Sequence, residues 1–192
     1  MGATTMLVTV REFLALPEPE GQRMELIGGE VVTMGRGGMP HEVTKSRIIQ
    51  ILAVWLAQNP VGALFSETMF QLDEQNCLIP DVSVLRHGHT YPGGTGSIQG
   101  APEIAIEVVS SEAAAHLENK IELYLFHGSK SVWVVFPKQR IVRVFDASGH
   151  SRKFEQNQTL EDPTALPGFR VPFRRSSKVS NTLSPPVKLK TT

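Results

Sequence analysis

The sequence has 192 residues, of which 41% are hydrophobic and 20% charged, a composition typical of a soluble globular protein. Lysine plus arginine and aspartate plus glutamate both number 19, so net charge gives no general signal for nucleic acid, and any phosphate-binding surface must be local. No apolar run approaches the ~20 residues of a membrane span, and the first residues lack the pattern of a secretory signal. We therefore expect a cytoplasmic protein without membrane attachment.

The first forty residues predict a short helix and a β-hairpin. Residues 9–16 open with Thr9 and carry Glu12 three positions later, the spacing of a capping box at a helix start. Residues 23–34 contain two apolar-rich runs separated by Gly28-Gly29. Glycine tolerates the positive φ values of a two-residue hairpin turn, so we expect a hairpin over these residues.

The middle of the chain predicts one long helix and two strands. After a loop at residues 35–40, apolar residues recur from His41 to about Asn59 at spacings of three and four, which indicates an amphipathic helix. Residues 63–72 and 77–85 lie between polar turns and are predicted to be strands. Pro80, in the second of them, is expected near a sheet edge or a bulge. The glycine-rich residues 86–100 indicate a loop.

The rest of the sequence predicts a strand, then a helix, then a meander of three strands. Residues 103–110 predict a strand, and residues 112–127 a helix capped by a preceding serine and ended by a following glycine. Residues 131–136, 140–146 and 151–155 predict three further strands. The order favours an α/β fold in which a mixed β-sheet is flanked by helices, with the hairpin at the N-terminal end.

The domain prediction follows from the apolar content along the chain. Residues 1–174 are expected to form a single domain, large enough to bury a core without disulfides or structural metals. Residues 175–192 contain few large apolar side chains, so we expect a disordered C-terminal tail.

The most informative residues for chemistry are two acids in apolar strands. Asp81 follows Pro80, and Glu107 lies in the run IAIEVVS. An ionised side chain in such a run is costly unless it is paired or binds a cation. If the two strands pair, the carboxylates can converge, and two carboxylates are suited to Mg²⁺. Lys120, on the following helix, would add a positive charge near a phosphate, which together gives a nuclease-type centre.

The ordered series of motifs resembles the Uma2 family, within the PD-(D/E)xK nuclease superfamily. The resemblance runs from about Thr9 to Phe173 and covers most of the chain. It is carried by FLALPEPEGQRMELIGGEVV, the helix beginning at His41, IPDVSVL, APEIAIEVVSSE, NKIELYLFHGSKSVWVV and LPGFRVPF. The series is fairly specific, whereas the Pro-Asp dipeptide alone would carry almost no information. A restriction-endonuclease-like fold is therefore expected.

The resemblance also implies roles for individual residues. Asp81 and Glu107 would hold a divalent metal, Mg²⁺ or Mn²⁺, with the main-chain carbonyl of Val108 as a further ligand. Lys120 would be the catalytic lysine. In the superfamily pattern that lysine stands two positions after the second acid, where this chain has Val109, so Lys120 matches the relocated position of Uma2-like sequences.

Two further residues match recurring Uma2 positions. Glu25 could supply a third acid or orient a water on the metal, and His41 could contact that water or the substrate phosphate. The other interpretations are an exposed hairpin residue for Glu25 and a helix-start residue for His41. Glu107 and Lys120 could likewise form a purely structural ion pair.

These observations favour a metal-dependent endonuclease that hydrolyses phosphodiester bonds of DNA. The main alternative is a catalytically inactive nuclease-like module that binds nucleic acid or a protein partner, and a third is a hydrolase of another phosphate ester. Because many nucleases of the expected fold pair up to address two strands, the resemblance also implies a homodimer.

Overall fold

The computed structural model describes residues 7–35, 37–88, 96–109 and 116–173. Its secondary structure follows the predicted order of helices and strands, with more and shorter strands than expected. In chain order the elements are α1 (Val10–Phe13), β1 (Gln22–Ile27), β2 (Glu30–Gly35), α2 (Met39–Gln58), β3 (Gly62–Ser66), β4 (Phe70–Gln71), β5 (Cys77–Leu78), β6 (Val82–Arg86), β7 (Ile98–Gln99), β8 (Ile104–Val108), α3 (Leu117–Phe126), β9 (Ser131–Phe136), β10 (Ile141–Asp146), β11 (Ser151–Glu155), β12 (Thr159–Asp162) and β13 (Leu166–Pro172).

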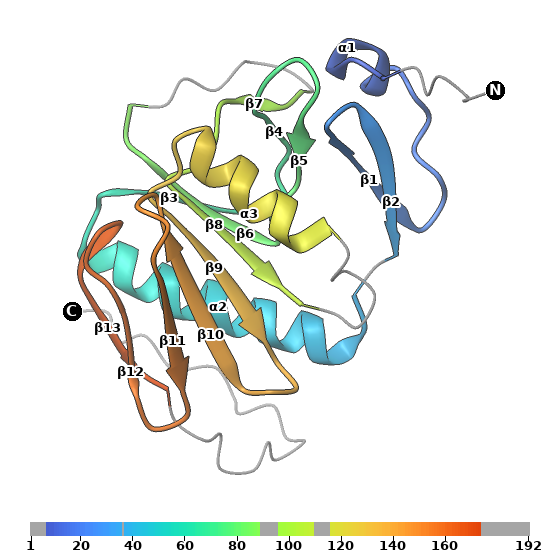
Figure 1. Ribbon diagram of the computed structural model, residues 1–192. Helices are drawn as coiled ribbons and strands as arrows, with labels where there is room; N and C mark the ends of the chain where they lie inside the picture. The colour runs from blue at the N-terminus through green and yellow to red at the C-terminus, as the bar shows by residue number, and fades with distance from the viewer. Residues whose placement is uncertain (1–6, 36, 89–95, 110–115, 174–192) are drawn as a thin grey trace, which may run out of the picture.

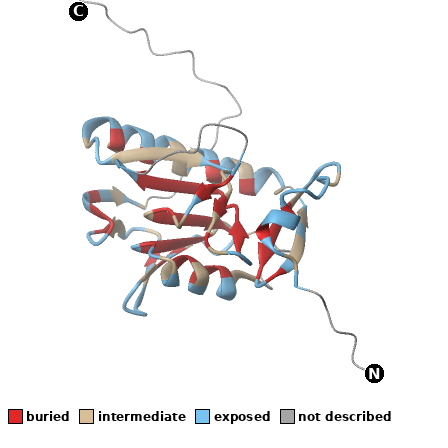
Figure 2. Ribbon diagram, turned by 90° about the horizontal axis from the view of Figure 1, so that it is seen from above, coloured by how far each residue is buried: buried red, intermediate tan, exposed pale blue. Residues whose placement is uncertain are grey.

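A six-stranded mixed sheet, in the order β11-β10-β9-β8-β6-β3, forms the centre of the fold. Helix α2 covers one face of this sheet and α3 covers the other (Figure 1). The alternation of side chains in β8 explains both contacts, because Ile104 and Ile106 pack in the cluster with Leu52 of α2, while Ala105 packs in the cluster with Ile121 of α3. Buried residues are concentrated in these central strands (Figure 2). The predicted α/β fold with helices flanking a mixed sheet is thus confirmed.

The N-terminal hairpin belongs to a second sheet, in the order β2-β1-β5-β4-β7. The turn Gly28-Gly29 has φ values of 58° and 79°, as the glycine pair predicted, and Thr9 and Glu12 form the predicted capping box of α1. Two of the chain's crossings between the two sheets are at residues 67–69 and at residues 79–81. These two crossings lie side by side, since the amide of Glu67 donates to the carbonyl of Asp81 at 3.3 Å.

Three predicted boundaries are wrong, each for a local reason. The predicted strand 63–72 breaks into β3 and β4 at Glu67, which has a φ of 51° and cannot continue a strand. The predicted strand 77–85 breaks into β5 and β6 around Pro80, because proline has no N–H for a strand ladder. Helix α2 begins at Met39 rather than His41, since Pro40 is well tolerated in the first helical turn, where the N–H has no partner.

The strands β12 and β13 form a third, two-stranded sheet that the sequence pattern did not predict. Its attachment point is Asp162, whose side chain is fully buried. The carboxylate accepts hydrogen bonds from Ser131 Oγ at 2.5 Å, Trp133 Nε1 at 2.7 Å and the amide of Ala165 at 3.1 Å. One acid thus joins β9 of the central sheet to the β12–β13 connection.

The substitution Asp162→Ala is expected to lower the free energy of unfolding by about 3 kcal/mol, because three buried donors lose their acceptor. Urea unfolding measures the change. The neighbouring Glu161→Ala is the control: Glu161 is partly exposed and lies 3.7 Å from Arg170, so its loss should cost no more than about 0.5 kcal/mol. Equal losses for the two variants would contradict a structural role specific to Asp162.

Some predictions fall on residues outside the described ranges. They are the C-terminal tail, the serine caps at residues 110 and 111, the first residues of the predicted helix 112–127, and the central part of the predicted loop 86–100. Among the described residues, no helix has the length and apolar character needed to cross a membrane.

Candidate active site

The predicted site lies where the two sheets meet, at the end of the central sheet that faces the hairpin. Strands β6 and β8 pair antiparallel, with Val82 opposite Ile106, so Asp81 and Glu107 come to the same sheet end. A cavity of about 250 Å³ opens there, and its lining includes Arg23, His41, Asp81, Glu107, Val108 and Lys120. The structure therefore brings the predicted acid pair and the predicted lysine into one cavity.

Asp81 is buried and held by groups from two directions. Its Oδ2 accepts a hydrogen bond from the amide of Val108 at 2.8 Å and lies 3.1 Å from His41 Nε2. Burial alone would raise the pKa of Asp81, but the hydrogen bonds from His41 and Val108 outweigh it and hold the pKa below its ordinary value. The carboxylate is therefore fixed in orientation and ionised at neutral pH.

Glu107 and Lys120 form a close ion pair between β8 and α3. Lys120 Nζ lies 2.7 Å from Glu107 Oε1, and the Tyr124 hydroxyl donates to the same oxygen at 3.1 Å. Burial raises the pKa of Glu107 to about 7; Lys120 opposes this effect, whereas the nearby Asp81 and Glu25 add to it. The raised pKa of Glu107 thus comes mainly from the burial of its carboxylate.

Lys120 is shared by two acids. Its Nζ donates to Glu25 Oε1 at 2.9 Å in addition to its contact with Glu107. Burial lowers the pKa of a lysine, but here the two carboxylates outweigh burial and hold the pKa of Lys120 above its ordinary value. Lys120 therefore keeps its positive charge although it is buried, in contact with both acids.

Glu25 is fully buried, so its alternative interpretation as an exposed hairpin residue is wrong. Its Oε1 accepts hydrogen bonds from Lys120 and from the amide of Ile79 at 2.6 Å, while its Oε2 is buried without a hydrogen-bond partner. Glu25 therefore fixes the lysine and the start of the 79–81 crossing at the same time.

His41 lies in the first turn of α2 and is buried between two acids. Its Nδ1 is 3.1 Å from Glu42 Oε1, and its Nε2 faces Asp81. The hydrogen bond to Asp81 raises the pKa of His41, against the effect of burial. Gly37 lies against the ring, because a Cβ at this position would come within 2.4 Å of it. His41 therefore orients Asp81, which a simple helix-start residue would not do.

Three charged residues at the site were not predicted from the sequence. Arg23 Nη2 lies 3.7 Å from Asp81 Oδ1, and Arg23 Nη1 lies 3.3 Å from Glu67 Oε1. Lys45 pairs with Glu67 and with Glu42, the latter at 2.7 Å. Arg23 could have been found, because it lies two residues before Glu25 and so on the same face of the hairpin strand. No local pattern marks Lys45 or Glu67.

The donors present fit a hard divalent cation. Mg²⁺ takes one or two carboxylates and retains several waters, which matches Asp81 and Glu107, and Val108 lines the same cavity. Among the described residues there is no group of three or more His, Cys, Asp or Glu side chains arranged to hold a metal ion, so a metal here would depend on two carboxylates. A bound cation would offset the cost of keeping the Glu107 carboxylate ionised in its buried position.

The architecture and the site define a nuclease-like α/β fold, with a mixed sheet between helices and an acid pair beside a lysine at one sheet end. The chain belongs to the Uma2 family, described as "Putative restriction endonuclease", whose model matches residues 10–174. This family description supports nuclease function in general.

One solved structure and the curated proteins complete the comparison. The crystal structure of a "putative nuclease belonging to DUF820" from Anabaena variabilis ATCC 29413 is similar, with a TM-score of 0.76 and 22% sequence identity. The alignment covers 86% of this chain and 95% of that chain, and at this identity the likeness shows the fold. No curated protein matches the chain.

Proposed function

We propose that the protein is a Mg²⁺- or Mn²⁺-dependent endonuclease that hydrolyses phosphodiester bonds of DNA. The observation that carries this proposal is the convergence of Asp81 and Glu107, from neighbouring strands, with Lys120 in one cavity. Membership of the Uma2 family supports the reaction class.

Asp81 and Glu107 would hold the metal, together with the main-chain carbonyl of Val108. When bound, the metal would polarise the phosphodiester and lower the pKa of a water molecule. The Val108 amide and His41 fix the orientation of Asp81 in advance. Asp81 is therefore fixed in orientation before a metal binds.

Lys120 supplies the positive charge that offsets negative charge growing on the phosphate during attack. Such fixed charges are worth most in a buried site, where they need no reorganisation when the reaction occurs. Glu25 holds the ammonium through Oε1 at 2.9 Å, so Lys120 keeps a fixed attachment even when its contact with Glu107 changes. Glu25 is thus a positioning residue in this proposal.

A second candidate is a catalytically inactive module that binds nucleic acid or a protein partner. It is favoured by the fact that Glu25 and Glu107 already neutralise Lys120 within the chain. Such a module would bind neither Mg²⁺ nor Mn²⁺ at the acid pair, and it would not cleave DNA.

Titration calorimetry with Mn²⁺ separates the two candidates. The wild-type protein is expected to bind Mn²⁺ and to nick plasmid DNA, whereas Asp81→Asn should lower the Mn²⁺ affinity by at least about 10-fold, since even residues that only support metal ligands cost this much. Far-UV circular dichroism shows that the variant is folded. Failure of the folded wild-type protein to bind Mn²⁺ would favour the inactive module.

The expected homodimer and the DNA substrate are part of the same proposal. Analytical ultracentrifugation of the purified protein tests the first, and the plasmid assay tests the second.

A further inference from the structure

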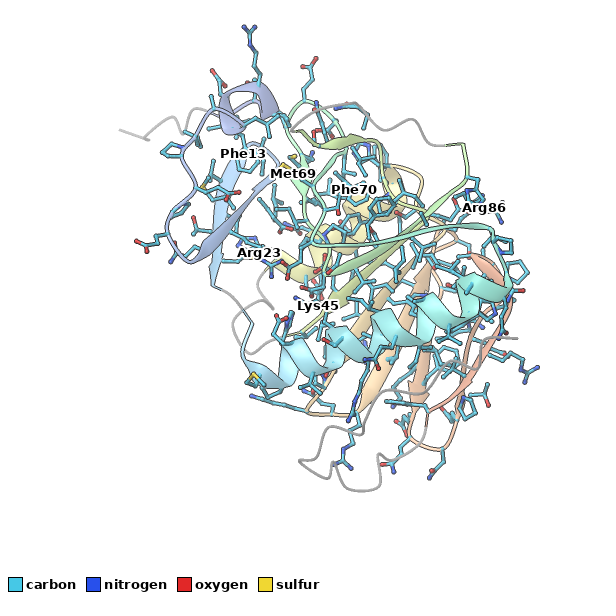
Figure 3. The ribbon with its side chains drawn as sticks, turned by 180° about the vertical axis from the view of Figure 1, so that it is seen from behind. Phe13, Arg23, Lys45, Met69, Phe70 and Arg86 are labelled. Carbon is cyan, nitrogen blue, oxygen red and sulfur yellow. The ribbon has the colours of Figure 1, made fainter. Side chains whose placement is uncertain are left out.

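Two basic side chains meet one acid beside the acid pair. Arg23 comes from β1 and Lys45 from α2, and both contact the same oxygen, Glu67 Oε1. Figure 3 shows Arg23 and Lys45 in the region between the hairpin and the first turns of α2. Two cations from separate elements thus form a small anion-binding site, and a carboxylate of the protein lies in it.

The acid of this group is more accessible than the cations. The side chain of Glu67 is 39% exposed, against 21% for Arg23 and 9% for Lys45. The two cations are also fixed by other partners: Arg23 faces Asp81, and Lys45 pairs with Glu42. Glu67 can therefore turn toward solvent while the cations stay in place.

The backbone at Glu67 is unusual. This residue has a φ of 51°, in the left-handed region that residues other than glycine, asparagine and aspartate seldom adopt. Conformations of this kind persist where the surrounding structure holds them, and they are concentrated at functional sites. Here the hydrogen bond from the Glu67 amide to the Asp81 carbonyl, at 3.3 Å, holds the turn against the 79–81 crossing.

The anion-binding site is next to the proposed reaction centre. Arg23 Nη2 lies 3.7 Å from Asp81 Oδ1, and Arg23 and Asp81 line the same cavity. An anion that replaced the Glu67 carboxylate would contact Arg23 Nη1, whereas Asp81 faces Nη2. A nucleic-acid strand with one phosphate at the acid pair could thus place another phosphate here.

We propose that Arg23 and Lys45 bind a backbone phosphodiester adjacent to the cleaved one, and that the Glu67 carboxylate occupies this subsite until substrate displaces it. This inference rests on the nuclease function proposed above. A phosphodiester and a carboxylate each carry one negative charge, so the exchange leaves neither cation unpaired. Arginine and lysine are also the residues that most often contact nucleic-acid phosphates.

A purely structural role for the same ion pairs makes the opposite prediction. If Glu67 only ties the β3–β4 turn to α2, Glu67→Gln should weaken the fold and leave DNA affinity unchanged. If Glu67 competes with the substrate, the same change should strengthen DNA binding.

Fluorescence anisotropy with a labelled DNA duplex in EDTA, where no cleavage occurs, measures the affinity. Glu67→Gln is expected to lower Kd by about 5-fold, and Arg23→Gln and Lys45→Gln to raise it by about 10-fold each. Each of the latter variants should also reduce the slope of log K against log salt by about 1, because one phosphate contact is lost. Thermal unfolding checks that every variant is folded.

Glu42→Gln is the matched control. It removes the same charge from a side chain that is 42% exposed and that also contacts Lys45, but Glu42 does not contact Arg23. A general change in net charge would affect both glutamine variants alike, so equal gains for Glu67→Gln and Glu42→Gln would overturn the proposal. A clearly larger gain for Glu67→Gln supports it.

Competition with inorganic phosphate tests whether the two cations contact the DNA backbone. Phosphate should weaken duplex binding by the wild-type protein more than chloride does at equal ionic strength, because the two cations attract either form of phosphate; an undiminished excess in both Arg23→Gln and Lys45→Gln would overturn the proposal. Unchanged binding of all three variants in a protein that cleaves DNA would overturn only the subsite. The expected changes in a protein that never cleaves would overturn only the nuclease function.

Discussion

Replacing Lys120 by methionine is expected to reduce plasmid cleavage by at least about 100-fold. The same change should lower the free energy of unfolding by about 3–5 kcal/mol, because Glu25 and Glu107 are left buried without their cation. A nicking assay and urea unfolding measure the two effects. The ammonium lies within 2.9 Å of both acids, so this single change affects catalysis and stability together.

A second substitution separates the two roles of Lys120. Adding Glu25→Gln to Lys120→Met removes one unpaired buried charge, while the amide oxygen of glutamine can still accept the hydrogen bond from Ile79. Much of the lost stability should return, since uncharged replacements of buried ion pairs are often close to neutral. Cleavage should stay absent. Recovery of cleavage along with stability would show that Lys120 is only a structural partner.

The second large effect is expected at Glu107. The substitution Glu107→Gln should reduce cleavage by at least about 100-fold and Mn²⁺ affinity by at least about 10-fold, because a neutral amide is a poor ligand for a hard cation. The glutamine oxygen can still accept the hydrogen bond of Tyr124. The fold should therefore be retained, and calorimetry with the nicking assay measures both losses.

Glu103 provides a matched control for Glu107. It lies four residues earlier in the chain, its side chain is 13% exposed against 11% for Glu107, and it pairs with Arg86 at 3.3 Å instead of lining the cavity. Glu103→Gln should leave cleavage and Mn²⁺ binding close to wild type. If both glutamine variants lost activity equally, the loss would reflect a general need for buried charge and not a metal site at Glu107.

The sequence was sufficient to bring together the acid pair and the lysine. Asp81 and Glu107 each interrupt a short apolar run, and the strands β6 and β8 at these two runs pair with each other. Lys120 lies on the helix that follows Glu107 in the chain. A charge inside an apolar strand is a local signal that needs no knowledge of distant contacts. This part of the site could therefore be predicted before the structure was known.

The rest of the site depends on contacts between distant segments. The alternation in β1 places Arg23 and Glu25 on one face, but it does not show that α3 covers that face and buries Glu25. Lys45 and Glu67 meet only because the chain leaves β3 in a left-handed turn, and no residue near Glu67 marks this turn. A glutamate in that conformation is rare enough that sequence patterns do not anticipate it.

The site is assembled from residues of two sheets, so its geometry depends on how the two sheets pack against each other. Asp81 and Glu107 move with the central sheet, whereas Glu25 moves with the hairpin sheet, and the crossings at residues 67–69 and 79–81 join the two sheets beside the site. A rotation of one sheet against the other would separate the lysine from one of its acids while leaving every strand intact. In the proposed nuclease, the alignment of the lysine with its acids thus depends on how the two sheets pack together, and residues at the contact between the sheets would affect the reaction without touching the substrate.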